Sequence, residues 1–223
     1  MKVTDNLAAI NEQIHEACHH AHRDPKEIKI VAVTKYVSIE RAKEAIDAGI
    51  THLGENREEG LSAKWEVLGD KPKWHFIGTL QSRKVKNIID KVDFIHSLDR
   101  VSLAAEIDKR AKRKIKCLVQ VKTSEEESKH GLVPNEVLSF IQQLGDYSNI
   151  EVVGLMTMAP FTQDEKLLRH CFRTLKELQQ EIQNQKLEYA PCHELSMGMS
   201  NDFTIAIEEG ATMIRIGTAL VGE

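Results

Sequence analysis

Residues 28–36 read Ile28-Lys29-Ile30-Val31-Ala32-Val33-Thr34-Lys35-Tyr36. The β-branched residues of this run predict a buried strand. An open doubly wound sheet usually carries a glycine-rich, phosphate-binding turn directly after its first strand. Here the strand ends in a threonine, a lysine and a tyrosine instead. The stretch therefore favours a closed barrel of parallel strands over the open sheet.

Short runs of the same kind recur along the chain, and a helical pattern follows each of them. The eight predicted strands cover residues 28–34, 51–53, 74–77, 94–97, 116–122, 152–156, 193–196 and 212–216. Strands that alternate with helices indicate a parallel sheet, because parallel neighbours need a crossover connection. Such units, repeated over about 200 residues, fit a compact (β/α)8 barrel.

Apolar residues at helical spacing predict amphipathic helices between the strands. The longest pattern covers residues 164–182, where Leu168, Leu175 and Ile182 fall on one face. Further patterns cover residues 38–48, 101–111 and 134–144, and residues 4–21 predict a helix before the first strand. We therefore expect a single domain over residues 1–223, an α/β fold of the (β/α)8 or TIM-barrel type with an extra N-terminal helix.

Composition and charge exclude several classes of protein. The 223 residues carry 34 acidic and 30 basic side chains, a net charge of −4, and so lack the positive field of a nucleic-acid-binding protein. No run approaches the roughly 20 apolar residues that a membrane span needs, and the first residues lack the apolar core of a signal peptide. Four dispersed cysteines argue against a disulfide scaffold. We expect a cytoplasmic protein with reduced thiols and no nucleic-acid or membrane partner.

Three polar clusters are interpreted as solvent-exposed surface. His19, His20 and His22 have no cysteine or carboxylate at metal-ligand spacing, so no metal site is expected. The basic run 109–114 ends a helix, where cations complement the helix dipole. The glutamates at 125–127 predict an exposed loop.

Lys35 is the first candidate for chemistry. In a parallel barrel the functional residues gather at the carboxyl ends of the strands, and Lys35 directly follows the first strand. A lysine that points into the barrel mouth and loses hydration there becomes a usable amine nucleophile, suited to form an imine with a carbonyl. The alternative is a lysine that extends from the strand end to water.

The last two strands end in small residues and glycines, where barrels bind phosphate. Ser196 through Ser200 supply hydroxyls, a glycine and the N–H groups of a starting helix, and Gly217 and Thr218 supply a second pair of N–H groups with a hydroxyl. Alternatively, Ser200 is only the N-cap of the next helix and Gly217 only a turn. A lysine opposite a phosphate-binding segment indicates pyridoxal 5′-phosphate as the cofactor.

Arg215 lies two residues before Gly217 and shares its face of the strand. From there it can reach the pyridine nitrogen of such a cofactor. A guanidinium group donates a hydrogen bond but cannot supply a proton, so the ring would stay unprotonated and be a poorer electron sink. The alternative is a partner for a surface carboxylate.

Three further residues are assigned to cofactor binding. His75 lies on a strand between Trp74 and Phe76, and either lines the pocket or is a hydrogen-bonded core histidine. Asn56 either bonds the ring hydroxyl of the cofactor or caps the next helix. Met197 belongs to the motif after the seventh strand and is included with it, although methionines more often pack than catalyse.

Specific motifs occur in a fixed order along nearly the whole chain. They are VAVTK (31–35), GEN (54–56), WHFIG (74–78), LQS (80–82), KVK (84–86), GLMTM (154–158), LSMGMS (195–200) and RIGT (215–218). The set closely resembles the pyridoxal phosphate homeostasis proteins, single-domain relatives of the alanine racemase N-terminal barrel. The methionine-rich motif and the His-Phe-Ile-Gly motif are specific, whereas the lysine alone is not.

The resemblance implies a barrel like the alanine racemase N-terminal domain, with pyridoxal phosphate held as an imine on Lys35. It implies a phosphate held around Ser196 and Gly217-Thr218, with Arg215 at the ring nitrogen. Members of the family are regarded as carriers or buffers in vitamin B6 homeostasis, with no established catalytic turnover. The expected partners are the cofactor and apo forms of the enzymes that use it, and the expected state is a monomer or weak dimer.

A pyridoxal-phosphate-dependent amino acid racemase is the alternative. A racemase needs acid–base groups on opposite faces of the substrate α-carbon, and Lys35 supplies only one. Tyr36 is expected to point away from Lys35 along the strand, and Tyr147 and Tyr189 lie in connections; a second subunit would have to supply the other base. A third hypothesis is a scaffold that contacts a partner through the basic run 109–114.

Overall fold

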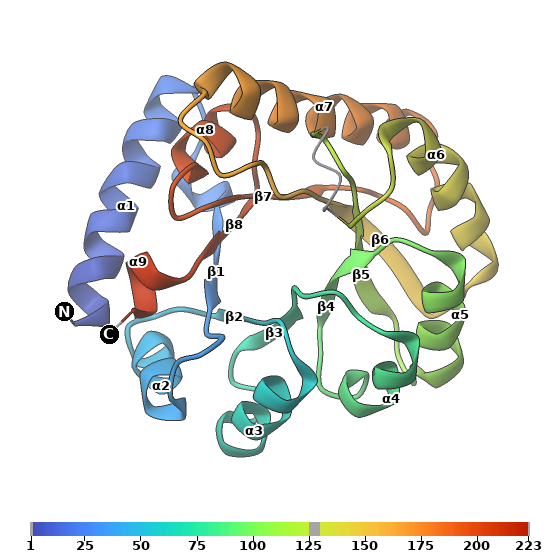
Figure 1. The fold of residues 1–223 in the computed structure, drawn as a ribbon, viewed down its shortest axis with the longest axis horizontal. Helices are drawn as coiled ribbons and strands as arrows, with labels where there is room; N and C mark the ends of the chain where they lie inside the picture. Colours follow the sequence, from blue (N-terminus) through green and yellow to red (C-terminus); the bar gives the residue numbers. More distant parts are fainter. Residues whose placement is uncertain (1, 125–129, 223) are drawn as a thin grey trace.

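The computed structural model describes residues 2–124 and 130–222, and it shows a closed barrel surrounded by helices (Figure 1). Within these residues, eight parallel strands follow one another in sequence order, and β8 closes the barrel against β1. The strands are β1 (Lys29–Val33), β2 (His52–Glu55), β3 (Lys73–Phe76), β4 (Phe94–Leu98), β5 (Ile115–Gln120), β6 (Ile150–Met156), β7 (Glu194–Met199) and β8 (Met213–Ile216). Because all are parallel, their carboxyl ends meet at one end of the barrel.

The register around β1 determines which loops become neighbours. Ala32 pairs with Leu53 of β2 on one side, and Val31 pairs with Arg215 of β8 on the other. The segments that follow β1, β2 and β8 therefore lie side by side, although they are far apart in the sequence.

The helices form a ring outside the barrel, and the two chain termini lie near each other beside α1 (Figure 1). The helices are α1 (Val3–His20), α2 (Ile39–Asp47), α3 (Glu58–Leu68), α4 (Val85–Ile88), α5 (Val101–Arg110), α6 (Pro134–Gln143), α7 (Glu165–Asn184), α8 (Phe203–Glu208) and α9 (Thr218–Val221). α1 packs against α8 and α9, and Asn6 donates a hydrogen bond to the Leu220 carbonyl oxygen over 3.0 Å. The N-terminal helix thus covers the side where the barrel closes.

Side-chain caps set the start of two of these helices. Ser38 accepts a hydrogen bond from a backbone N–H in the first turn of α2, and Asp164 accepts two in the first turn of α7. Such caps satisfy N–H groups that have no partner within the helix. Pro134 occupies the first turn of α6, where its missing N–H costs nothing.

The apolar core has two parts. The larger part includes both strand and helix residues, such as Trp74 of β3 and Phe172 of α7, and so lies between the barrel and its helices. The smaller part consists of strand residues alone, which identifies it as the barrel interior: Val31, Phe94, Leu118, Val153, Met156 and Met213. These two layers give the loops at the carboxyl end a rigid support.

The predicted strands are all present, but β7 runs to Met199, beyond its predicted end at residue 196. α8 begins at Phe203 with Asp202 as its N-cap residue, so the alternative that Ser200 caps this helix is wrong. The periodicity gives no residue range for α4, α8 and α9, because helices of 4 to 6 residues contain too few apolar positions. It gives none for α3 either, where Lys64 occupies a buried position. The glutamates at 125–127 lie outside the described residues.

Candidate functional site

A cavity of about 530 Å³ opens at the carboxyl end of the barrel. Loops that follow several different strands contribute to its wall, as the register around β1 requires. Five of the residues predicted for the site line it: Lys35, Asn56, Arg215, Gly217 and Thr218. The fold therefore brings together an amine, an amide, a guanidinium group and a glycine-hydroxyl segment from three separate parts of the chain.

Lys35 lies exposed at the rim of this cavity. The expectation that the barrel mouth removes its hydration is therefore wrong. Its neighbour Tyr36 has a left-handed backbone with φ of 68°, and the Lys35 Nζ lies 5.6 Å from the centre of the Tyr36 ring. The expectation that Tyr36 points away from Lys35 is also wrong, because β1 has already ended at Val33 and the alternation of a strand no longer applies.

Asn56 follows β2 and lies against the loop after β3. A Cβ atom at Gly78 would lie 2.3 Å from the Asn56 carbonyl oxygen, so the two loops approach this closely only with glycine at that position. Asn56 does not cap α3, whose N-cap residue is Arg57. The close approach places Asn56 in the wall of the cavity near Lys35.

Arg215 enters the cavity from β8 and is only 4% exposed. Its Nη1 donates to the Ser196 Oγ over 2.6 Å, and its Nη2 donates to the Thr157 carbonyl oxygen over 2.8 Å. Burial lowers the pKa of Arg215 to about 10, and the carboxylate of Asp202 opposes that shift. Arg215 is therefore a fixed cation at neutral pH, and its burial shows that the alternative of a surface ion pair is wrong.

Three residues predicted for the site do not line this cavity. Ser196 and His75 are fully buried in the barrel interior, where Ser196 accepts a hydrogen bond from Arg215. His75 has hydrogen-bond partners for both ring nitrogens, as the interpretation of a core histidine requires. Met197 is packed in the core between strands and helices. Successive strand residues face opposite sides, so Ser196 and Met197 cannot both face the interior.

A second cavity of about 710 Å³ adjoins the first. The residues shared by the two walls are Lys35, Asn56, Gly78 and Thr79. Lys35 therefore lies at the boundary between the cavities, and a group attached to its amine could occupy either one.

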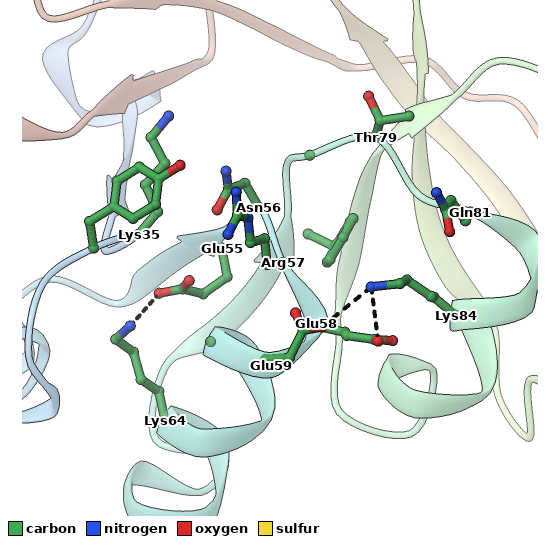
Figure 2. Close-up of a pocket in the computed structure, with 14 residues that line it drawn as sticks. Lys35, Glu55, Asn56, Arg57, Glu58, Glu59, Lys64, Thr79, Gln81 and Lys84 are labelled. Atoms are coloured by element: carbon green, nitrogen blue, oxygen red, sulfur yellow. Dashed lines mark hydrogen bonds and ion pairs between the residues drawn. The ribbon is translucent and has the colours of Figure 1, made fainter.

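Ion pairs fix the other lysines of the second cavity, as Figure 2 shows. Lys64 Nζ lies 2.9 Å from Glu55 Oε1 in a nearly buried pair, and Lys84 Nζ lies 3.0 Å from Glu58 Oε1 at the rim. Among the residues the structure describes, no carboxylate forms an ion pair with Lys35. Its amine is the one lysine amine in the described wall that no carboxylate neutralises.

Sequence reasoning did not assign several residues that line the first cavity. They are Val33, Ile77, Gly78, Thr79, Gln120, Met158 and Asn201, whereas Met199 and Ser200 of the wall belong to the segment already predicted to bind phosphate. The available signal is position, because each lies at or just beyond the carboxyl end of a strand. The sequence does not show which of these side chains turn inward, since that depends on where each strand ends.

The structure also bears on the basic run 109–114, on metal binding and on membrane spans. In the basic run, Lys112 lies 3.7 Å from Asp90 and Arg113 lies 3.8 Å from Asp93. Within residues 2–124 and 130–222, no three His, Cys, Asp or Glu side chains are grouped so that they could hold a metal ion. No helix in that part of the chain combines the length and the apolar character needed to cross a membrane.

Comparison with known proteins defines the class first. The family model for the alanine racemase N-terminal domain matches residues 6–223. The alanine racemase of Clostridium difficile 630 has a TM-score of 0.80 at 16% identity, over 98% of this chain and 56% of the racemase. At that identity the likeness concerns the fold alone. The molecule is thus a barrel of the alanine racemase N-terminal class.

Full-length relatives narrow the class to one family. The pyridoxal phosphate homeostasis proteins of Aquifex aeolicus (strain VF5) and Pasteurella multocida (strain Pm70) are 41% and 34% identical, over 100% of this chain and 99% and 97% of their own. The structure of PipY from Synechococcus elongatus PCC7942 with PLP bound has a TM-score of 0.87 at 32% identity, over 99% of this chain and 100% of PipY. The chain belongs to the pyridoxal phosphate homeostasis protein family.

Proposed function

We propose that this chain binds pyridoxal 5′-phosphate covalently through Lys35 and holds it in the cytoplasm as a carrier or buffer of the cofactor. The observation that carries the proposal is the convergence of Lys35, Arg215, Gly217 and Thr218 on one cavity. The PLP-bound structure of PipY and the names of the full-length relatives support it.

The residues present fit the chemical groups of this cofactor. Lys35 offers an exposed amine, suited to attach an aldehyde, that no carboxylate among the described residues neutralises. Arg215 offers a buried donor for a ring acceptor. At Gly217 the nearest side-chain or backbone atom to an added Cβ would be 3.6 Å away, so a ligand can approach this backbone closely. Thr218, the next residue, also lines the cavity and offers a hydroxyl. When bound, the cofactor supplies an electrophilic carbon and an electron-withdrawing ring.

The charge of Arg215 favours holding the cofactor over turnover. A guanidinium group at the ring nitrogen donates a hydrogen bond without delivering a proton. A racemase would also need a base opposite Lys35. Among the described residues no tyrosine lines the smaller cavity, and Tyr36 lies beside Lys35 rather than across from it. These features support a carrier.

The rim position of Lys35 supports a role in cofactor transfer. Because this side chain is exposed, an amine of another protein can reach the carbon that Lys35 holds and replace Lys35 there. We therefore include apo forms of pyridoxal phosphate enzymes among the proposed partners. If the attachment lysines of the donor and acceptor proteins were both deeply buried, the cofactor could not pass directly from one to the other.

Covalent labelling tests the binding site. The chain is mixed with pyridoxal phosphate, its visible absorption spectrum is recorded, and borohydride reduction is followed by peptide mapping. We expect the label on Lys35 alone. It should disappear in Lys35→Ala and persist in Lys84→Ala, the matched control for another lysine of the adjoining cavity. A label scattered over surface lysines, or unchanged in Lys35→Ala, would refute the proposal.

Deuterium incorporation separates a carrier from a racemase. The loaded protein is incubated in D2O with a panel of amino acids, and the α-carbon is examined for deuterium and for inverted configuration. A carrier leaves both unchanged. Rapid incorporation that Lys35→Ala abolishes would establish the racemase instead.

A further inference from the structure

α9 directly follows Gly217 and begins with Thr218, so the wall of the smaller cavity continues into this helix. Its 4 residues form a single turn, in which the Gly217 carbonyl oxygen accepts hydrogen bonds from the N–H groups of Leu220 and Val221 over 2.9 and 3.0 Å. The Thr218 carbonyl oxygen accepts a hydrogen bond from the Gly222 N–H over 3.0 Å. The position of Gly217 and Thr218 is therefore tied to the position of the residues that end the turn.

A helix of one turn is not stable in water by itself. Its formation fixes several residues for a single hydrogen bond, and the last carbonyl groups of a helix have no partner within it. In α9 these are the carbonyl groups of Leu220, Val221 and Gly222. Leu220 and Val221 are buried, so other parts of the protein must supply hydrogen-bond donors in place of water.

Two neighbouring helices supply these donors, because α9 packs against both α1 and α2 (Figure 1). Asn6 of α1 donates from Nδ2 to the Leu220 carbonyl oxygen over 3.0 Å. Arg41 of α2 donates from Nε to the Val221 carbonyl oxygen over 3.2 Å and from Nη2 to the Gly222 carbonyl oxygen over 2.7 Å. All three carbonyl groups at the end of the turn are thus bound from outside it.

Arg41 is itself held in one orientation. Its Nη1 donates to the Glu44 Oε2 over 2.7 Å, and its side chain is only 11% exposed. A planar guanidinium group presents its donors in a fixed fork. Ser38 holds the backbone of the same turn by accepting a hydrogen bond from the Arg41 N–H over 3.0 Å. The first turn of α2 therefore binds residues 221 and 222 at a fixed position.

The same helix adjoins the attachment lysine. Lys35 lies in the short connection between the end of β1 at Val33 and the start of α2 at Ile39. Arg41 therefore links the part of the wall that the proposed function assigns to the aldehyde with the part that it assigns to the phosphate.

We propose that Arg41, together with Asn6, is a positioning residue for phosphate binding: by holding the end of α9, the two side chains fix Gly217 and Thr218 relative to Lys35. This inference rests on the proposed function, since it takes Gly217 and Thr218 as the phosphate-binding segment. Arg41 and Asn6 line neither cavity, so both act through α9. Their loss should weaken the binding of a phosphate group and leave the attachment of an aldehyde to Lys35 nearly unchanged.

Two aldehydes separate an effect on phosphate binding from an effect on the whole fold. Pyridoxal phosphate carries the phosphate group, whereas 5′-deoxypyridoxal has the same aldehyde and ring without it. The full chain is titrated with each compound and reduced with borohydride, and the label on Lys35 is measured by peptide mapping. The half-saturating concentration of 5′-deoxypyridoxal divided by that of pyridoxal phosphate gives a phosphate preference.

The wild type should prefer pyridoxal phosphate. Arg41→Met should lower the phosphate preference at least about fivefold, the factor that corresponds to one lost hydrogen bond. The half-saturating concentration of 5′-deoxypyridoxal should stay close to its wild-type value. Arg41→Lys retains the charge and can still donate to a carbonyl oxygen, so it should recover part of the preference.

Two further variants distinguish positioning from a general effect of charge. Asn6→Ala removes a donor to α9 without changing the charge, and it should also lower the phosphate preference. Arg113→Met is the matched control. Arg113 donates to the Val92 carbonyl oxygen over 2.6 Å and precedes β5, so it lies at the opposite end of the barrel from Lys35. Its loss removes one positive charge and should leave the phosphate preference unchanged.

The proposal is overturned if Arg41→Met keeps the wild-type phosphate preference, or if it raises both half-saturating concentrations by the same factor. It is also overturned if Asn6→Ala keeps the preference, because the effect of Arg41 would then be one of charge. If Arg41→Met does not fold, Asn6→Ala decides. A wild type that both aldehydes label equally on Lys35 overturns this inference alone, whereas a wild type without label on Lys35 refutes the proposed function as well.

Discussion

Removing one partner of the Glu55–Lys64 pair should destabilise the barrel strongly. Figure 2 shows this pair beside the larger cavity, between β2 and α3. The two side chains are 2% and 7% exposed, and the hydroxyl of Thr34 donates to the same Glu55 oxygen over 2.6 Å. Lys64→Met therefore leaves a buried carboxylate with only a neutral donor.

The size of this effect follows from the burial. Breaking a buried ion pair by removing one partner costs about 3–5 kcal/mol, because the remaining charge is uncompensated. Replacing both partners removes that penalty. The double variant Glu55→Gln/Lys64→Met keeps an acceptor for Thr34, and we expect it to lie within about 1–2 kcal/mol of the wild type.

Urea unfolding at pH 7 measures these differences in the free energy of unfolding. The single variant should shift the midpoint to lower urea at an unchanged slope. Lys84→Met is the control, since its pair lies at the exposed rim of the same cavity, and it should shift the midpoint far less. Two results would contradict this prediction: a Lys64→Met cost below about 1 kcal/mol, or a double variant as unstable as the summed costs of Lys64→Met and Glu55→Gln.

Three further predictions follow from burial, packing and charge. Burial lowers the pKa of His75 and His96 in the folded protein, so below pH 6.5 the unfolded chain binds protons at these histidines that the folded chain does not. The free energy of unfolding should therefore fall below pH 6.5 by about 1.4 kcal/mol per pH unit for each histidine, until the pH reaches its native pKa. Urea midpoints that stay constant from pH 7.5 to 5.5 would contradict this. Gly78→Ala should cost about 1–3 kcal/mol by calorimetry, because its Cβ would overlap the Asn56 carbonyl oxygen, and a wild-type melting temperature would show that the loops are not so close. Arg169→Met removes the pairs from α7 to the carboxylates at the end of α8 and should cost about 1 kcal/mol at low salt and less in 1 M salt; a cost independent of salt would point to packing instead.

The fold could be predicted because its signals are local and repeated. β-branched runs and amphipathic helices alternate along the chain, and only a few topologies accommodate that order. Lys35 and the Gly217-Thr218 segment could be assigned for a similar reason, since the carboxyl end of a barrel strand is an identifiable position. The short helix α9 could not be predicted, because it has too few residues for a helical period.

The site was predicted less completely than the fold. Met197 was placed with Ser196 in one motif, yet the alternation of β7 sends the two side chains to opposite sides. Lys35 was expected to lose its hydration, yet β1 ends at Val33 and leaves it exposed. Both outcomes depend on the residue at which a strand ends, which local propensity does not determine within two or three positions.

The alternation of strands and helices, the barrel and the residue types at its carboxyl end all follow from the hydrophobic period and the order of the chain. Which side chains meet depends instead on the packing of the whole molecule. His52, His75 and His96 are spaced by 23 and 21 residues and carry no shared motif. They form one hydrogen-bonded chain because the register of adjacent parallel strands turns all three inward, and that register is set by the closure of the whole barrel.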